Sequence, residues 1–267
     1  MGALKGMFSF FTMIRLDITK EDMDAMDRRF WLVPVIGAFY GLIAAFLMTA
    51  LMQFANISAL ASSVLTFFII FAMNRFLHID GTIDVGDGLV VAGTREDHLR
   101  ALKDTRIGAG GMAFALMVIL MSITFTASIW NGVIIAALMF TAEVSAKVGM
   151  VSAAAFGEPG DGMAGNSVRN TSARSLLYAV LLAAVLITVF AVMIHLISVN
   201  TALPVALPHH FVIFAIAAII VSVITGGIMS AVAKKNFGMV NGDVLGATNE
   251  LTRAAVLLTF LVIISVI

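Results

Sequence analysis

The residues with the clearest chemical potential form one short acidic segment. Residues 78–88 read HIDGTIDVGDG, and Asp80, Asp84 and Asp87 follow one another at positions i, i+4 and i+7. On a helix with this spacing the three carboxylates share one face. Like charges on one face repel each other, and a divalent cation would remove the repulsion. Because hard oxygen ligands beside phosphate suit Mg²⁺, the spacing predicts that these three aspartates bind Mg²⁺.

The glycines of this segment predict a close approach by a ligand. Gly81, Gly86 and Gly88 carry no side chain, so a diphosphate could reach the backbone there. The structural alternative is a solvated acidic patch at a membrane edge. Calcium is a second alternative, although the segment has neither the EF-hand spacing nor its closing glutamate.

A basic segment follows the acidic one. Residues 94–111 read TREDHLRALKDTRIGAGG, which predicts an amphipathic surface helix with a basic face, ending at a glycine turn that begins at Gly108. Basic side chains such as Lys103 and Arg106, placed beside an acidic metal cluster, are typical of phosphate binding. The alternative is a surface helix that uses Lys and Arg against anionic lipid.

The composition places these segments on a membrane protein. Hydrophobic residues make up 61% of the 267-residue chain and charged residues only 12%, whereas soluble domains carry about 25% charged residues. The chain has no cysteine, which excludes thiolate metal sites and a cysteine nucleophile, and a net charge of zero argues against nucleic acid as a partner. We expect an all-α bundle of about seven spanning helices. They are expected at residues 32–54, 57–73, 112–130, 133–156, 176–198, 211–232 and 245–267.

Six spanning helices is the alternative count, because the last stretch contains Glu250 and Arg253. The fourth stretch contains Glu143 and Lys147, one helical turn apart. Ionisable groups at such depth usually face the bundle interior. Two interpretations of this pair are open: a self-neutralising structural pair, or a role in a substrate cavity.

The placement of charge predicts the orientation of the chain. With the N-terminus inside, fifteen of the 16 Lys and Arg residues fall in the inside segments 1–31, 74–111, 157–175 and 233–253, and the outer connectors near 56, 131 and 199–210 carry none. This matches the positive-inside rule. Fifteen of the 16 acidic residues fall on the same side. We therefore expect a single domain over 1–267 in the cell membrane, with an interfacial N-terminal segment at 1–31 and a cytoplasmic catalytic region at 74–111.

These motifs together resemble the cobalamin synthase family, adenosylcobinamide-GDP ribazoletransferase. That family has the pattern H-x-D-G-x-x-D-x-x-D-G followed by M-K-D-S-R-x-G, and here residues 102–108 read LKDTRIG. Its pattern T-G-D-x-x-G-A followed by Glu resembles NGDVLGA at residues 241–247, followed by Glu250. The glycine-rich segment 157–165 is a looser match. The family's N-terminal proline is missing here.

The resemblance implies that the ribose 3′-hydroxyl of α-ribazole, or of its 5′-phosphate, attacks the cobinamide-linked phosphate of adenosylcobinamide-GDP and that GMP leaves. It implies Mg²⁺ as cofactor and assigns roles to ten residues. The metal ligands would be Asp80, Asp84 and Asp87; the catalytic residues Asp84, Asp104 and Asp243; and the substrate-binding residues His78, Lys103, Arg106, Gly108 and Glu250.

Two other classes compete with this interpretation. A CDP-alcohol phosphatidyltransferase would use similar chemistry, but its D-G-x-x-A-R pattern is not matched, since Asp84 stands where the alanine would be. A small-solute or metal transporter would usually distribute polar groups through the membrane depth. The sequence leaves open the form of the acceptor, homo-oligomerisation and association with other enzymes of the pathway.

Overall fold

The computed structural model describes residues 2–129, 134–160, 162–201, 207 and 210–266. Within these ranges the chain forms helices joined by short connections, and its only β pairing is an isolated parallel bridge between Pro159 and Val240. Parts of the outer connectors expected near 131 and at 199–210, namely residues 130–133, 202–206 and 208–209, lie outside the described residues, as does Asp161 of the glycine-rich segment. The expectation of an all-α architecture is confirmed for the described part of the chain.

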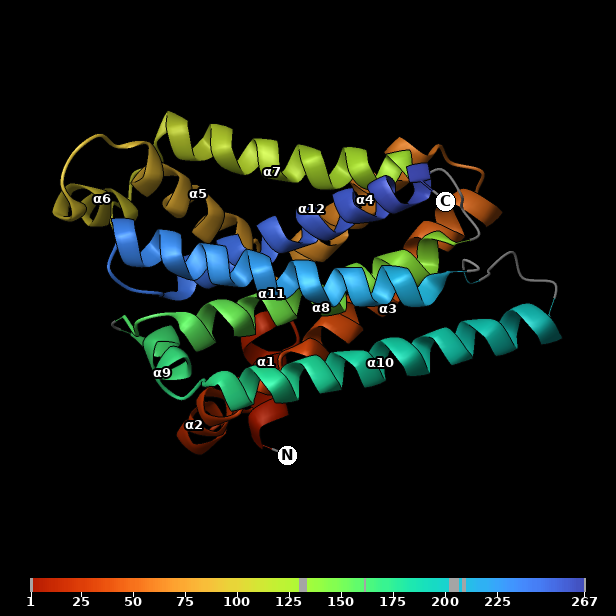
Figure 1. Ribbon diagram of the computed structural model, residues 1–267, viewed down its shortest axis with the longest axis horizontal. Helices are drawn as coiled ribbons and strands as arrows, with labels where there is room; N and C mark the ends of the chain where they lie inside the picture. The colour runs from red at the N-terminus through yellow and green to blue at the C-terminus, as the bar shows by residue number, and fades with distance from the viewer. Residues whose placement is uncertain (1, 130–133, 161, 202–206, 208–209, 267) are drawn as a thin grey trace.

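Within the described residues, six helical segments are each long and apolar enough to cross a membrane (Figure 1). They agree with the stretches expected from hydropathy to within a few residues at most ends. The first, Phe30–Phe54, comprises η1 (Phe30–Leu32), α3 (Pro34–Thr49) and the π-helical turn η2 (Ala50–Phe54). The others are α7 (Ala109–Ser128), α8 (Ile135–Phe156), α10 (Ala173–Asn200), α11 (Phe211–Asn236) and α12 (Gly242–Val266).

The span expected second along the chain, at residues 57–73, corresponds to the first helix of a sharply bent pair. α4 (Ala59–Met73) and α5 (Leu77–Val90) meet at an angle of 93°. Only together are the two helices long and apolar enough to cross a membrane. Arg75 and Phe76 between them both adopt the left-handed conformation, with φ of 57°, which costs energy for non-glycine residues. Arg75 Nη2 donates to the carbonyls of Phe10 at 2.8 Å and Ser9 at 3.3 Å, which ties the break to the end of α1.

The break changes the expected place of the acidic motif. We expected residues 74–111 to form a cytoplasmic region that begins where the second span ends. Instead of a loop, the motif forms the helix α5, which follows α4 after the bend and ends at Val90. The assignment of residues 74–111 to a cytoplasmic catalytic region stays a prediction. α5 packs against α7 and α12, so its aspartates are positioned by spanning helices rather than by a loop.

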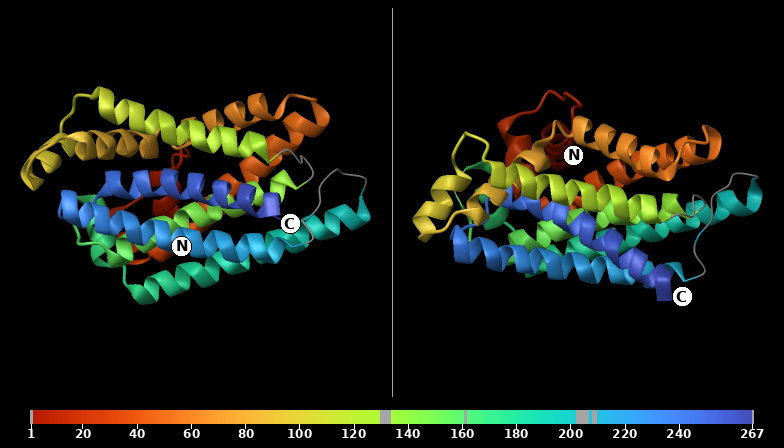
Figure 2. Two further views of the ribbon diagram at one scale, coloured as in Figure 1. Left: turned by 45° about the horizontal axis from the view of Figure 1, so that its top comes forward. Right: turned by 90° about the horizontal axis from the view of Figure 1, so that it is seen from above.

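α8 is the central helix of the bundle. Every residue from Ile135 to Ala154 is buried, and α3, α10, α11 and α12 surround the helix (Figure 1). Small residues at the contacts allow this dense packing. A Cβ added at Gly37 of α3 would lie 2.6 Å from the Glu143 carbonyl, and one added at Gly226 of α11 would lie 2.5 Å from Ser152 Cβ. The left view of Figure 2 shows α12 between α7 and α11.

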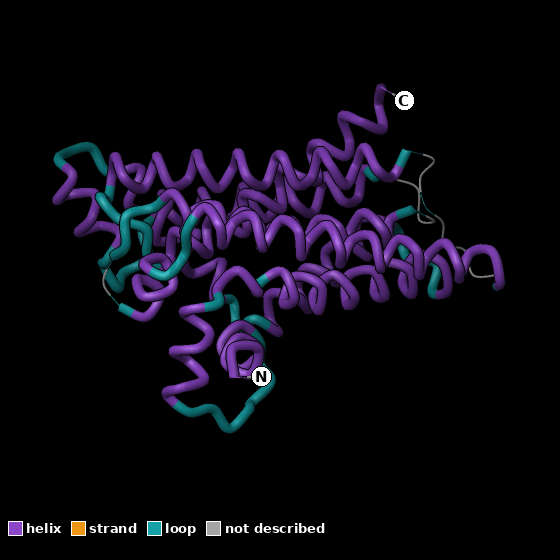
Figure 3. Tube along the Cα trace, turned by 60° about the horizontal axis from the view of Figure 1, so that its bottom comes forward, coloured by secondary structure: helices purple, strands orange, loops and turns teal. Residues whose placement is uncertain are grey.

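Short helices complete the structure at the bundle end where α5 finishes. α6 (Arg95–Leu102) and α9 (Met163–Arg169) lie there, and the hairpin of α1 (Gly2–Phe11) and α2 (Lys20–Arg28) projects beside the bundle (Figure 3). A capping box begins α2, since Thr19 and Asp22 exchange side chain–backbone hydrogen bonds. Tyr40 Oη donates to the Phe11 carbonyl at 2.7 Å and thereby holds α1 against α3.

Candidate active site

Close packing of α5 on α12 creates the acidic cluster. A Cβ added at Gly81 would lie 2.7 Å from Asp243 Cα, and one added at Gly246 would lie 3.2 Å from His78 Cα. The two backbones therefore touch at two points, and the helices run antiparallel. This contact places Asp80 and Asp84 of α5 beside Asp243 of α12, in agreement with the expectation that the first and third motifs act together.

The cluster brings four carboxyl groups together, and no cationic side chain in the described part of the chain pairs with them. Asp84 is half-buried and lies close enough to Asp243, Asp80 and Asp87 for their charges to act on it. Among the described residues, none of the ion pairs between Lys, Arg or His and a carboxylate involves these four aspartates. Such a cluster of oxygen ligands is electrostatically suited to a divalent cation.

The arrangement suits a metal ion that takes only a few ligands from the protein, as Mg²⁺ does, and not one that is bound entirely by protein side chains. Within the described part of the chain, no three acidic or histidine side chains are already arranged around a common ion position. Mg²⁺ usually takes only one or two protein carboxylates and completes its shell with water and substrate phosphate oxygens. The donor set of Asp80, Asp84 and Asp243 therefore fits this ion, and the assignment of Mg²⁺ stays a prediction.

Asp87 has a structural role that the sequence did not indicate. Its Oδ2 accepts the Gly108 N–H at 2.7 Å and its Oδ1 accepts the Gly111 N–H at 2.7 Å. These amides belong to the first turn of α7, whose N–H groups have no partners within the helix. Asp87 thus fixes the start of α7 against α5. The Gly108 amide donates to Asp87, and the predicted role of Gly108 in substrate binding stays a prediction.

Removing the Asp87 carboxylate should loosen this turn. We expect Asp87→Ala to lower the stability of the folded protein by about 1–3 kcal/mol, because two partly buried amides lose a charged acceptor. The exposed segment before Gly108 should then be cut faster by trypsin after Lys103 and Arg106. Trypsin digestion and thermal unfolding in detergent would measure both effects. Unchanged digestion together with lost activity would show that Asp87 acts on the ligand and not on the fold.

The glycines of the motif serve helix packing, so their expected role in diphosphate approach is wrong. The space beside Gly81 is filled by the backbone of Asp243. A Cβ at Gly86 would lie 2.8 Å from Phe114 Cβ of α7, and one at Gly88 would lie 2.7 Å from Phe237 Cε1. These positions are glycine because α5 is enclosed by neighbouring helices.

Asp104, Arg106 and Lys103 lie apart from the cluster, on the exposed connection after α6. Asp104 Oδ1 accepts from the Arg106 amide at 3.0 Å, and its Oδ2 accepts from Arg106 Nη2 at 3.0 Å. The Arg106 side chain and amide hold the pKa of Asp104 below its ordinary value. The structure therefore does not bring Asp104 into contact with Asp84 or Asp243, and the roles predicted for these three residues stay predictions.

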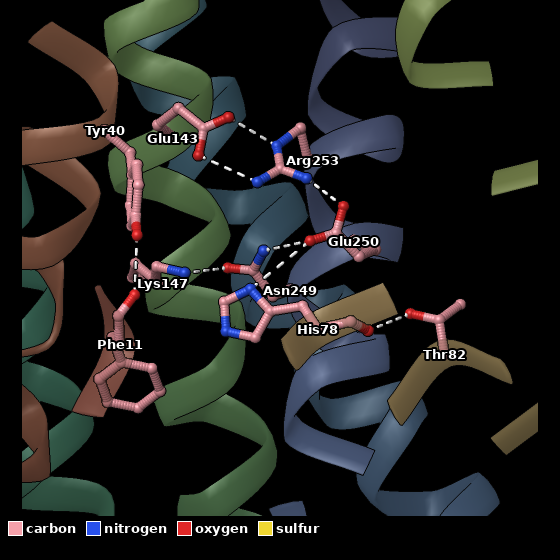
Figure 4. A network of polar contacts seen from close by, with 9 residues as sticks. All are labelled: Phe11, Tyr40, His78, Thr82, Glu143, Lys147, Asn249, Glu250 and Arg253. Atoms are coloured by element: carbon pink, nitrogen blue, oxygen red, sulfur yellow. Dashed lines mark hydrogen bonds and ion pairs between the residues drawn. The ribbon is translucent and has the colours of Figure 1, made fainter. Parts of the chain in front are cut away.

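A network of buried charges joins α8 to α12 (Figure 4). Arg253 donates to both oxygens of Glu143, from Nε at 2.6 Å and from Nη2 at 3.0 Å, and its Nη1 donates to Glu250. Lys147 Nζ donates to Asn249 Oδ1 at 2.7 Å, and Asn249 Nδ2 donates to Glu250 Oε1 at 2.9 Å. All five side chains are at most 1% exposed. Buried charges require this degree of pairing.

The network revises two expectations. Glu143 and Lys147 do not neutralise each other within α8, because each pairs with a residue of α12. Glu250 is buried and both of its oxygens accept hydrogen bonds, so this arrangement gives no support to its predicted contact with substrate. Asn249 was missed. The available signal was the balance of two acids and two bases across two apolar stretches, which favours pairing between helices.

His78 lies where the network meets a pocket. Its Nδ1 faces Glu250 Oε1 at 3.5 Å, and within the described residues neither ring nitrogen has a hydrogen-bond partner. The pocket separates α1, α2 and α9 from α5, α8 and α12. Asp80, Asp243 and His78 line it on one side, so the acidic cluster and the pocket form one continuous site.

Comparison with known proteins identifies similar chains. A family model described as cobalamin-5-phosphate synthase matches residues 3–261. An adenosylcobinamide-GDP ribazoletransferase from Methanocella arvoryzae is 30% identical over 96% of this chain and 94% of its own length. One from Methanosarcina mazei is 35% identical, but the alignment spans 59% of each chain. One from Pyrococcus furiosus is 27% identical over 96% of this chain and 97% of its own. No solved structure is significantly similar.

Proposed function

The chain belongs to the cobalamin-5-phosphate synthase family, and on that premise we propose that it transfers adenosylcobinamide phosphate from adenosylcobinamide-GDP to α-ribazole or its 5′-phosphate. The ribose 3′-hydroxyl of the acceptor attacks the cobinamide-linked phosphorus. A new P–O bond forms, the bond from this phosphorus to the GMP oxygen breaks, and the hydroxyl proton passes to a carboxylate. The products are adenosylcobalamin or its 5′-phosphate, and GMP.

The observation that carries this proposal is the meeting of Asp80, Asp84 and Asp243 beside a pocket, where no Lys, Arg or His of the described residues pairs with them. When bound, Mg²⁺ would neutralise charge on the diphosphate and on the leaving GMP. The close contact between α5 and α12 fixes the backbones of these aspartates and so holds their carboxylates in position. Asp80 and Asp243 both belong to the cluster and line the pocket. Since the motif resemblance implies a catalytic role for Asp243, we assign Asp243 as the acceptor of the hydroxyl proton.

Exposed basic side chains support the binding of phosphate. Arg106 and Lys103 lie on the connection that leads to Gly108, and Asp87 ties Gly108 to the acidic helix. A charged donor approaching this end of the bundle would meet guanidinium and ammonium groups that suit phosphate oxygens. Arg106 pairs with Asp104 in the described structure and would exchange this carboxylate for a phosphate of the ligand.

We further propose that this end of the bundle faces the cytoplasm across the cell membrane. The surface Lys and Arg residues at this end support that orientation through the positive-inside rule. Arg253 no longer counts among the fifteen basic residues expected in the inside segments, because it is buried within α12 and is not exposed in a connection. The remaining asymmetry is unchanged in direction.

Magnesium dependence tests the metal assignment. Purified protein in liposomes should release GMP from adenosylcobinamide-GDP and α-ribazole with Mg²⁺ and should release none with excess EDTA. Returning Mg²⁺ should restore the rate. Full turnover in EDTA would contradict the metal assignment. Release of CMP from a CDP-alcohol, with no reaction of the cobinamide donor, would favour the competing transferase class.

A further inference from the structure

We propose that the pocket beside the acidic cluster binds the aromatic base of the acceptor nucleoside, with its ribose directed toward Asp80 and Asp243. This inference rests on the proposed function, because it assigns one substrate of that reaction to one part of the site. It names the acceptor's base as the occupant, in preference to the donor's guanine or its corrin ring.

The buried part of the pocket is lined mainly by apolar side chains. Phe10 and Phe11 of α1, Met26 of α2, Phe30 of η1 and Met150 of α8 line it. Aromatic faces and thioether groups pack well against planar heterocycles. The shallow part carries Asp80, Asp243 and the exposed Gly242. A nucleoside bound base-first would therefore place its ribose hydroxyls at the carboxylates, as the proposed reaction requires.

The chemistry of the lining favours a base with few polar groups. Among the described lining residues, the polar side chains are His78, Asp80, Asp243 and Ser167, and the Ser167 hydroxyl already donates to Asp27 at 2.6 Å. Guanine has several donors and acceptors that would lose their water partners against this lining. The base of α-ribazole, a dimethylbenzimidazole, has one free ring nitrogen and apolar edges. A corrin macrocycle is too wide to enter between packed helices.

His78 supplies the hydrogen bond that such a base needs. It is 2% exposed and lines the pocket; its Nδ1 faces Glu250, and its Nε2 has no hydrogen-bond or ion-pair partner among the described residues. An unpaired polar group at this depth is costly unless a ligand completes it. Glu250 lies on the other side of the ring and is itself held by Arg253, so His78 is kept at the wall of the pocket.

Two substitutions on opposite walls test the pocket with little disturbance of the fold. Gly242→Leu would narrow the mouth, since a Cβ there meets only Ala164 Cβ, at an ordinary contact distance of 3.7 Å. Phe11→Leu would remove an aromatic face, while Tyr40 still holds α1 through the Phe11 carbonyl. The matched control is Gly227→Leu in α11, where a Cβ would meet only Phe156 Cδ2 at 3.9 Å.

The measurements are KM for each substrate in liposomes and equilibrium dialysis of α-ribazole. We expect both pocket variants to weaken acceptor binding about tenfold, the size of a lost aromatic contact, and to leave KM for adenosylcobinamide-GDP within about twofold. Phe11→Leu should also reduce the preference for α-ribazole over the same nucleoside carrying adenine. Gly227→Leu should match the wild type.

The outcomes separate this proposal from the proposed function. Wild-type protein that turns over normally, together with unchanged acceptor binding in both pocket variants, would overturn the pocket assignment and leave the function intact. A selective rise in the donor KM would place the donor's guanine there instead and would also overturn it. Wild-type protein that binds α-ribazole but releases no GMP would count against the function. If Gly242→Leu does not fold, the Phe11→Leu dialysis result decides.

Discussion

Asparagine in place of Asp84 is expected to lower kcat/KM by about a thousandfold or more, because a preorganised charge at the reacting phosphate is lost. Asp84 lies between the carboxylates of Asp80, Asp87 and Asp243 and is the member of the cluster on which the other three act. Asparagine keeps the shape of the side chain and removes only the charge. The rate of GMP release in liposomes would measure the effect.

The stability of this variant separates chemistry from folding. Since Asp84 lies among like charges, removing its charge should leave the thermal unfolding temperature in detergent unchanged or raise it. Glu96→Gln is the matched control. It also replaces an acid by its amide, but Glu96 lies in the first turn of α6, outside the cluster. Near-normal activity of the Asp84 variant would contradict the assigned role.

Methionine in place of Arg253 is expected to destabilise the folded protein by about 3–5 kcal/mol, because it leaves buried carboxylates without their cation. Arg253 is the shared partner of Glu143 and Glu250, and its guanidinium also lies over the rings of Phe67 and Phe71 at 5.6 and 5.7 Å. The loss would separate α8 from α12 at the centre of the bundle. The thermal unfolding midpoint in detergent would measure it.

Two further variants test whether the lost ion pairs cause the destabilisation expected for Arg253→Met. Arg100→Met removes an exposed arginine that pairs with Asp97 on the surface, so it should change stability by at most about 1 kcal/mol. Adding Glu143→Met to Arg253→Met removes one of the two stranded carboxylates and should recover part of the loss. If the single Arg253 variant unfolds like the wild type, the network does not hold the helices together.

The spanning helices could be predicted because their signal is local. A run of apolar residues long enough to cross the bilayer is visible without knowledge of its neighbours, and α7, α8, α10, α11 and α12 all match such runs. The break between α4 and α5 had no such signal. The break falls at Arg75 and Phe76, with no glycine or proline there to mark a turn. The Arg75 side chain instead donates to carbonyls of α1, which lies far away in the sequence.

The candidate site was predictable in its residues but not in their partners. The spacing of Asp80 and Asp84 put both on one helix face, and the resemblance added Asp243. Their meeting depends on the contact of Gly81 with the Asp243 backbone, which is a tertiary fact. For the same reason Asp87 could not be distinguished from the other two aspartates until the amides of α7 were placed against it.

The pairing of the buried charges was also beyond local reasoning. Glu143 and Lys147 are neighbours along one helix, and the simplest arrangement joins them. Arg253 offers Glu143 a bidentate contact that a lysine cannot provide, and Asn249 then accepts from Lys147. Which of these arrangements forms depends on how α12 lies against α8.

The most direct test of the account is a product measurement with wild type and Asp84→Asn side by side in liposomes. Each sample would receive adenosylcobinamide-GDP, α-ribazole and Mg²⁺, and both GMP and the cobalamin product would be quantified. The account predicts that the wild type forms the two products in equal amounts and that the variant forms neither while remaining folded in the membrane. GMP without a cobalamin product, or equal turnover by the variant, would contradict it.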